Sequence, residues 1–110
     1  MISPLAYIHP EARIGENVEI GPFVFIDKNV VIGDNNVMIH PFAYIDKNVE
    51  IGDDCEIMPH ASLMSGTRMG NRNRVFNGAV IAAEPQDFFY KGGDTIAVIG
   101  DDNVIRENVV

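Results

Sequence analysis

Aliphatic residues recur at every sixth position along most of the chain. The first series contains Ile8, Ile14, Ile20, Ile26 and Ile32, and after one seven-residue step the second contains Ile39, Ile45, Ile51, Ile57, Leu63, Met69, Val75 and Ile81. The same phase returns after an interruption, at Ile99 and Ile105. A period of six matches neither the 3.6 residues of an α-helical turn nor the two-residue alternation of an ordinary strand. It is typical of a short strand followed by a corner.

A second column of side chains supports the same repeat. Four residues after each aliphatic from Ile8 to Val75 stands a small or medium-sized residue, except at Asn36 and Asn73: Ala12, Val18, Val24, Val30, Ala43, Val49, Cys55, Ala61, Thr67 and Ala79. The residue directly after the aliphatic is often Gly or Asp, as in Gly15, Gly33 and Asp46. Both types suit a corner, because they accept a positive φ or form local side-chain hydrogen bonds.

Three units of strand and corner make a triangular coil of about 18 residues, and stacked coils pair as parallel strands about 4.8 Å apart. We therefore predict an all-β fold, a parallel β-helix of about six triangular coils. Residues 1–110 are expected to form a single domain, with one protruding loop near residues 82–98, where the repeat is interrupted.

Two stretches of the chain are nearly identical to each other. Residues 22–35 read PFVFIDKNVVIGDN and residues 41–54 read PFAYIDKNVEIGDD, so ten of fourteen positions agree. The offset of 19 is three repeats plus one residue, and it coincides with the seven-residue step between Ile32 and Ile39. A tandem duplication explains this pattern. The extra residue, near Met38, predicts a bulge or a widened corner.

Charge and composition exclude several classes of partner. The formal net charge of −8 argues against a nucleic-acid ligand, because phosphate binding depends on clustered Lys and Arg. No run of about 18 apolar residues is present to insert into a membrane. The first four residues lack the features of a secretory signal, and a single cysteine, Cys55, favours a reducing compartment, the cytoplasm. Because Cys55 stands in the small column, we predict a buried apolar residue and not a nucleophile.

Three local stretches resemble a known enzyme family. Repeats of the form Ile-Gly-x-x-Val-x resemble the hexapeptide transferase superfamily, whose members form left-handed parallel β-helices. Within it, IHPEARIGENVEIGPF (8–23), AAEPQDFFYKGGDT (82–95) and IGDDNVIRENVV (99–110) resemble the UDP-N-acetylglucosamine O-acyltransferases, which begin lipid A synthesis. The middle stretch carries most weight, because that family places a loop with a Gln-Asp pair there.

The resemblance implies an activity and a set of partners. It implies transfer of a 3-hydroxyacyl chain from acyl carrier protein to the 3-hydroxyl of UDP-N-acetylglucosamine, with a histidine as general base, in a homotrimer whose active sites lie between subunits. Gln86 and Asp87 match the loop pair that helps hold the sugar nucleotide. Phe88 and Phe89 replace the Leu-Lys that usually follows, so a cationic contact to the nucleotide is lost. Phe88, Phe89 and Tyr90 are expected to clasp a neighbouring subunit, and no cofactor is expected.

The histidines of this chain do not match the family's base. That histidine lies in a His-rich stretch that the 110 residues do not contain, and a helical tail that helps bind acyl carrier protein is missing too. His9 and His40 look like corner residues and His60 points outward, at phases too different for a three-histidine zinc site. We therefore expect no catalytic residue and no metal site, and a truncated, inactive chain. A non-catalytic trimeric β-helix scaffold, or another hexapeptide-repeat acyltransferase, remains the alternative.

Overall fold

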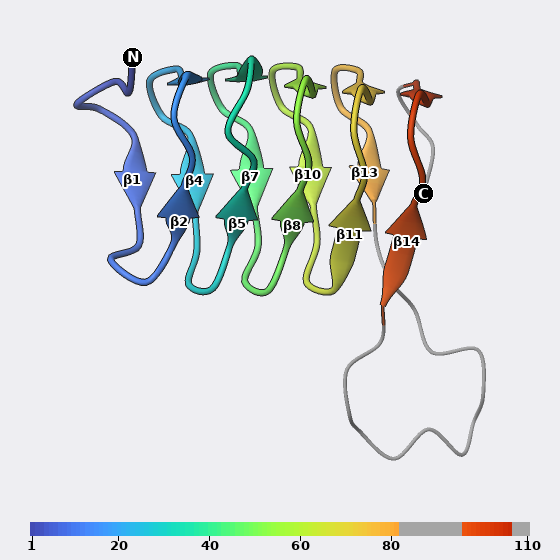
Figure 1. Ribbon diagram of the computed structural model, residues 1–110. Helices are drawn as coiled ribbons and strands as arrows, with labels where there is room; N and C mark the ends of the chain where they lie inside the picture. Colours follow the sequence, from blue (N-terminus) through green and yellow to red (C-terminus); the bar gives the residue numbers. More distant parts are fainter. Residues whose placement is uncertain (82–95, 107–110) are drawn as a thin grey trace, which may run out of the picture.

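Short β-strands are the regular elements of the structure, a computed structural model that describes residues 1–81 and 96–106 (Figure 1). The strands are β1 (Tyr7–Ile8), β2 (Arg13–Ile14), β3 (Val18–Ile20), β4 (Phe25–Ile26), β5 (Val31–Ile32), β6 (Val37–Ile39), β7 (Tyr44–Ile45), β8 (Glu50–Ile51), β9 (Glu56–Ile57), β10 (Ser62–Leu63), β11 (Thr67–Met69), β12 (Arg74–Val75), β13 (Val80–Ile81), β14 (Ala97–Ile99) and β15 (Val104–Ile105). In the described ranges, no helix is long and apolar enough to cross a membrane.

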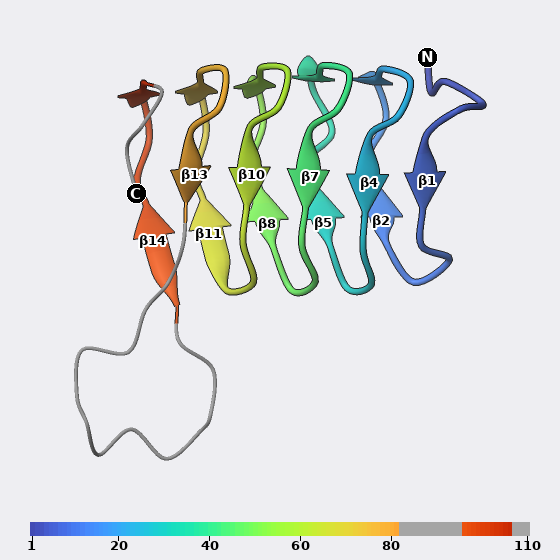
Figure 2. The same ribbon diagram turned by 180° about the vertical axis from the view of Figure 1, so that it is seen from behind.

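Every third strand belongs to the same parallel sheet. The first sheet has the order β1-β4-β7-β10-β13, the second β14-β11-β8-β5-β2 and the third β15-β12-β9-β6-β3. In Figure 1 the second sheet runs upward in front and the first runs downward behind, as the reverse view of Figure 2 confirms, while the chain advances from left to right. This sense of rotation is left-handed. The predicted left-handed parallel β-helix is therefore confirmed.

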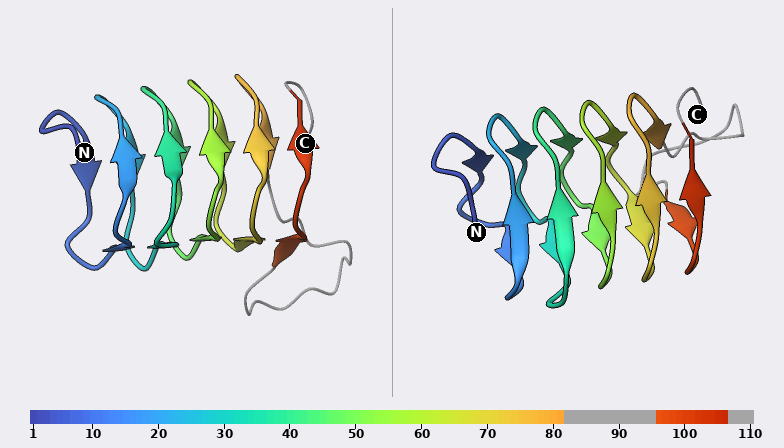
Figure 3. Two further views of the ribbon diagram at one scale, coloured as in Figure 1. Left: turned by 45° about the horizontal axis from the view of Figure 1, so that its top comes forward. Right: turned by 90° about the horizontal axis from the view of Figure 1, so that it is seen from above.

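The coils stack in a single row (Figure 3). Three five-stranded sheets give five coils of three described strands each, and a bridge between Ile2 and Ile20 adds part of another before them. The five coils and the partial one agree with the prediction of about six coils. The repeat is already re-established at β14, whose Thr67–Ala97 pairing joins it to β11, so residues 97 and 98 belong to a strand and not to the expected loop.

The periodic aliphatics point inward and stack on their copies in the next coil. In the first sheet Ile8 pairs with Ile26, Ile26 with Ile45, and Ile45 with Leu63. Of these, Ile26, Ile45 and Leu63 are fully buried, whereas Ile8, in the first coil, is only partly buried. Each buried aliphatic side chain contributes about 1.5–3 kcal/mol. These columns are therefore the main source of stability.

The corners contain the residues with positive φ. From Val18 onward, a positive φ is found at the residue before each described small-column position, for example 54° at Asn17, 58° at Asn29 and 58° at Asn48. The glycines directly after the aliphatics lie in the corners, as expected, but the positive φ falls at other corner residues. Among the described residues, the glycines with positive φ are Gly66 and Gly78, and they occupy the same place as these asparagines.

The glycines after the aliphatics allow neighbouring coils to pack closely, because a side chain at these positions would overlap the next coil. A Cβ atom on Gly52 would lie 2.6 Å from the carbonyl oxygen of Gly70 in the next coil, which is closer than real Cβ atoms come. The aspartates at this position act as expected, through local hydrogen bonds. Asp46 Oδ1, for example, accepts the N–H of Lys47 at 2.8 Å.

Two corners carry a phenylalanine in the left-handed conformation. Phe23 has φ 62° and Phe42 has φ 67°, a conformation that costs a residue with a bulky side chain about 1–2 kcal/mol. Their rings stack at 5.3 Å, and Phe42 stacks in turn on His60 at 5.1 Å. A stacked pair returns about 0.5–1.5 kcal/mol, so stacking offsets part of this cost.

The extra residue of the duplicated segment lies in a corner. The corner between β2 and β3 has three residues, 15–17, whereas the corner between β5 and β6 has four, 33–36. Val37 and not Asn36 then fills the buried small column. The predicted widened corner is confirmed, and it explains why Asn36 broke the pattern.

Candidate functional site

The predicted acceptor loop stands in the sequence between β13, in the first sheet, and β14, in the second. Gln86 and Asp87, and also Phe88, Phe89 and Tyr90, lie outside the described residues. The strands on either side of them, β13 and β14, are described. Ala97 donates its N–H to the carbonyl oxygen of Gly66 at 3.0 Å. This bond places the return of the chain directly against the corresponding corner of the preceding coil.

Polar side chains surround that preceding corner. The N–H of Ser65 donates to Asp46 Oδ2 at 3.2 Å, so the carboxylate of one coil holds the corner of the next. Arg68, on the outer face of β11, donates from Nη1 to the carbonyl oxygen of Asn48. Its Nε lies 3.4 Å from Glu50 Oε2. Arg68 is therefore a partly buried cation held in place two residues after Gly66, the residue against which the chain returns.

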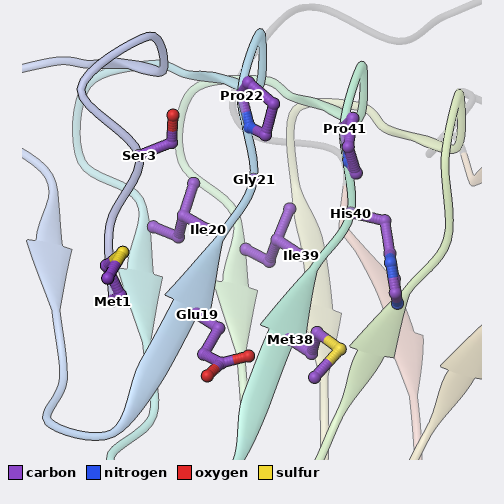
Figure 4. Close-up of a pocket in the computed structure, with 10 residues that line it drawn as sticks. All are labelled: Met1, Ser3, Glu19, Ile20, Gly21, Pro22, Met38, Ile39, His40 and Pro41. Carbon is purple, nitrogen blue, oxygen red and sulfur yellow. The ribbon is translucent and has the colours of Figure 1, made fainter.

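A shallow groove lies on the outer face of the third sheet (Figure 4). It has a volume of about 380 Å³. Figure 4 shows Glu19 and Met38, on β3 and β6, at one end and the corner prolines Pro22 and Pro41 at the other, with His40 along one side. Two further hollows also include Met38, so the groove continues along this face.

One ion-paired cluster borders the groove. His40 Nε2 lies 2.8 Å from Glu56 Oε2, and Glu56 Oε1 lies 3.3 Å from Arg74 Nε. The three residues follow or lie on strands β6, β9 and β12, so the cluster ties three coils together. A histidine held by a carboxylate can accept or donate a proton. From the sequence His40 was expected only to be a corner residue. The contact with Glu56 depends on the pairing of Met38 with Glu56 in neighbouring coils, which brings the two side chains close together.

The other two histidines also have contacts within the chain. His9 Nδ1 accepts the N–H of Glu11 at 3.0 Å within its own corner, and His60 is stacked on Phe42. Over residues 1–81 and 96–106, no three His, Cys, Asp or Glu side chains are grouped to hold a metal ion.

Cys55 is buried, as predicted for its column. Its side chain is 1% exposed, and its thiol donates to the carbonyl oxygen of Gly70 at 3.2 Å. Burial raises the pKa of the Cys55 thiol. A thiol that is both covered and protonated is a poor nucleophile, which agrees with a packing role.

Comparisons with known proteins agree with this fold. A model of the bacterial transferase hexapeptide (six repeats) matches residues 11–38 and 29–63. The acyl-[acyl-carrier-protein]–UDP-N-acetylglucosamine O-acyltransferase of Bartonella quintana is 37% identical over 108 residues, which cover 98% of this chain and 32% of that protein. The chain thus spans about a third of the length of this relative.

Solved structures of UDP-N-acetylglucosamine acyltransferases are also similar to this chain. The UDP-N-acetylglucosamine acyltransferase of Bacteroides fragilis is 53% identical, with a TM-score of 0.63, over 98% of this chain and 35% of that one. The enzyme of the same name from Francisella novicida is 27% identical, with a TM-score of 0.80, over 96% of this chain and 41% of that one. The chain carries the hexapeptide repeat of bacterial transferases and is similar, over almost all of its length, to about a third of the UDP-N-acetylglucosamine O-acyltransferases.

Proposed function

We propose that this chain is the β-helical part of an acyltransferase that moves a 3-hydroxyacyl chain from acyl carrier protein to the 3-hydroxyl of UDP-N-acetylglucosamine, the first step of lipid A synthesis. The observation that carries the proposal is the 53% identity with the Bacteroides fragilis enzyme over 98% of this chain. That aligned length includes most of the interruption of the repeat, where the Gln86–Asp87 pair stands.

In this proposal the acceptor is held at the corner where the loop leaves the coils. Gln86 and Asp87 contact the sugar nucleotide. Arg68 is a cation beside the base of that loop, because it pairs with Val98 where β11 meets β14. A cation here is useful since Phe89 stands where the family has Lys, and the diphosphate needs positive charge. Phe88, Phe89 and Tyr90 cover a neighbouring subunit of a homotrimer in the cytoplasm.

In this proposal, binding of the sugar-nucleotide acceptor does not depend on the residue that catalyses acyl transfer. Attack of the sugar hydroxyl on a thioester needs a general base within hydrogen-bond reach of that hydroxyl. His9 and His60 are engaged in corner and stacking contacts, and His40 lies on the third sheet, paired with Glu56. We therefore expect the 110-residue polypeptide to bind the acceptor without catalysing acyl transfer.

Isothermal titration with UDP-N-acetylglucosamine tests this proposal. We expect saturable binding that weakens at least tenfold in Gln86→Ala and in Asp87→Asn. The exposed Glu16, in a corner of the first coil, provides a matched control, and Glu16→Gln should bind like the wild type. Equal affinities in all four proteins would exclude the loop as the acceptor site.

A trimeric β-helix scaffold is the second candidate. The observation that favours it is that each of the three histidines has a contact within the chain. A scaffold predicts no heat of binding in the same titration. An acyl-transfer assay with 3-hydroxyacyl-loaded acyl carrier protein and UDP-N-acetylglucosamine gives a further test of the scaffold. Turnover above background would show that one of the three histidines, or another residue of this chain, acts as a base.

A further inference from the structure

Two arginine side chains lie against one phenylalanine ring on the third sheet, whose outer face is turned to the viewer in the right-hand view of Figure 3. The ring is that of Phe76, the residue directly after β12. The guanidinium carbon of Arg74 lies 5.3 Å from the ring centre, and that of Arg106 lies 4.6 Å from it. Both distances are within the roughly 6 Å over which an aromatic ring attracts a cation. One ring therefore brings two positive charges together.

The stacking of the coils explains why these three side chains meet. β12 pairs with β15, and the N–H of Phe76 donates to the carbonyl oxygen of Ile105 at 2.7 Å. Arg106 follows Ile105 and therefore stands beside Phe76 in the next coil, whereas Arg74 precedes Phe76 by two residues. Phe76 is half-buried, but Arg74 and Arg106 are exposed. The ring thus holds both guanidinium groups in place while leaving them accessible to solvent.

The surrounding carboxylates balance these two charges incompletely. Arg74 has one carboxylate partner, Glu56 at 3.3 Å. Glu56 lies on β9, on the opposite side of β12 from Arg106. Among the described residues, no carboxylate forms an ion pair with Arg106. Two like charges side by side on a sheet are unfavourable, and an anion bound between them would remove this repulsion, even in a chain whose net charge is −8.

The presence of two guanidinium groups favours a phosphoryl group over a carboxylate as the ligand. A guanidinium group is a planar fork that binds two oxygens at once. One fork is enough for a carboxylate, as the neighbouring corner shows, where Arg72 donates from Nε to Asp102 Oδ1 at 2.7 Å and from Nη2 to Asp102 Oδ2 at 3.2 Å. A terminal phosphoryl group has three acceptor oxygens and a charge of about −1.5 to −2. It can therefore accept hydrogen bonds from both forks.

We propose that Arg74, Phe76 and Arg106 form a binding site for a phosphoryl group, either free phosphate or a phosphate monoester. The two guanidinium groups bind the phosphoryl oxygens, and the ring of Phe76 holds the guanidinium groups in position. The site lies on the third sheet, whereas the acceptor loop of the proposed function stands between strands of the first and second sheets. It is therefore a second site, and it does not depend on the proposed function.

Amide chemical shifts measured during a titration with inorganic phosphate test this site. We expect saturable shifts at Phe76 and Arg106. Arg106→Gln should raise the dissociation constant at least about tenfold, because it removes a pair of charge-assisted hydrogen bonds. Phe76→Leu keeps an apolar side chain but removes the aromatic face, and it should weaken binding about threefold. Arg13→Gln changes an exposed arginine on β2, in the second sheet, and is the matched control that should bind like the wild type.

A second titration, with phenyl phosphate, distinguishes the two sources of the phosphoryl group. Saturable shifts at Phe76 and Arg106 with both compounds would support a phosphate monoester as the ligand, and shifts with inorganic phosphate alone would support free phosphate. No saturable shift at these residues with either compound, or equal dissociation constants in all four proteins, would overturn the proposal. Shifts of equal size at Arg13 would mean non-specific ion pairing and would overturn it too. The titration with UDP-N-acetylglucosamine tests the acceptor loop separately, so either site can fail without the other.

Discussion

Asn73 is hydrogen-bonded to Asn103 across the interruption of the repeat. The buried Asn73 Oδ1 accepts the N–H of Asn103 at 2.8 Å, and its Nδ2 donates to the carbonyl oxygen of Gly100 at the same distance. One fully buried amide thus fixes the corner of the last described coil. The relationship matters for function, because this coil includes β14, the strand that follows the predicted acceptor loop.

Replacing Asn73 with Val should loosen the last coil. The substitution leaves a backbone N–H and a carbonyl without their partner, which costs about 1–3 kcal/mol. Urea unfolding should show the lower free energy of unfolding, and hydrogen exchange should speed up most in residues 97–106. The control is Cys55→Val, which changes the same column one coil earlier. In this variant, hydrogen exchange in residues 97–106 should stay close to that of the wild type. Equal exchange in the two variants would contradict this role of Asn73.

Gly52→Ala should destabilise the fold by about 1–3 kcal/mol, because the new methyl group would overlap the backbone of Gly70. A Cβ on Gly100, at the same corner of the last described coil, would have no atom of the described residues within 4 Å. Gly100→Ala should therefore stay within about 0.5 kcal/mol of the wild type. Thermal unfolding compares the two. If both variants melt alike, close packing is not the reason for these glycines.

The buried thiol of Cys55 predicts a dependence of stability on pH. Its pKa is raised in the folded chain by burial, whereas an unfolded cysteine titrates near about 8.5. The folded state therefore binds the proton more tightly, and the free energy of unfolding should fall as the pH rises above that value. Urea unfolding at about pH 7 and at about pH 10, on either side of the unfolded pKa, should show this fall in the wild type and a smaller one in Cys55→Val.

The ion-paired cluster on the third sheet should be structural. In Glu56→Gln both His40 and Arg74 lose their carboxylate partner, and partly exposed pairs of this kind contribute about 0.2–1 kcal/mol. We expect a small loss of stability and an unchanged affinity for UDP-N-acetylglucosamine. Arg74→Gln is the matched control, since it leaves the His40 contact in place. A loss of affinity in Glu56→Gln alone would move the acceptor site to the groove of Figure 4.

Much of the fold could be predicted because one period controls it. The inward direction of Ile26, Ile45 and Ile57 follows from counting in sixes, since each buried position repeats in the next coil. Counting does not give the backbone conformation within a corner. For this reason the sequence pattern located the corners but not the corner residues, such as Asn17 and Asn29, that have a positive φ.

Fewer features of the candidate site could be predicted from the sequence. The contact between His40 and Glu56 joins residues 16 apart, a spacing that becomes meaningful only once the coil length and the pairing of β6 with β9 are known. Likewise, Arg68 reaches the carbonyl oxygen of Asn48 in the preceding coil. Gln86 and Asp87 stay predictions, because they were inferred from resemblance and their neighbours depend on how the loop lies.

The central claim is that this β-helix presents an acceptor loop to UDP-N-acetylglucosamine, and amide chemical shifts measured during a titration test it most directly. We predict saturable shifts at Gln86 and Asp87 and at the residues that flank the loop base, Gly66 and Ala97. Shifts confined to His40 and Glu56 in the groove of the third sheet, or no saturable shifts at all, would contradict the claim.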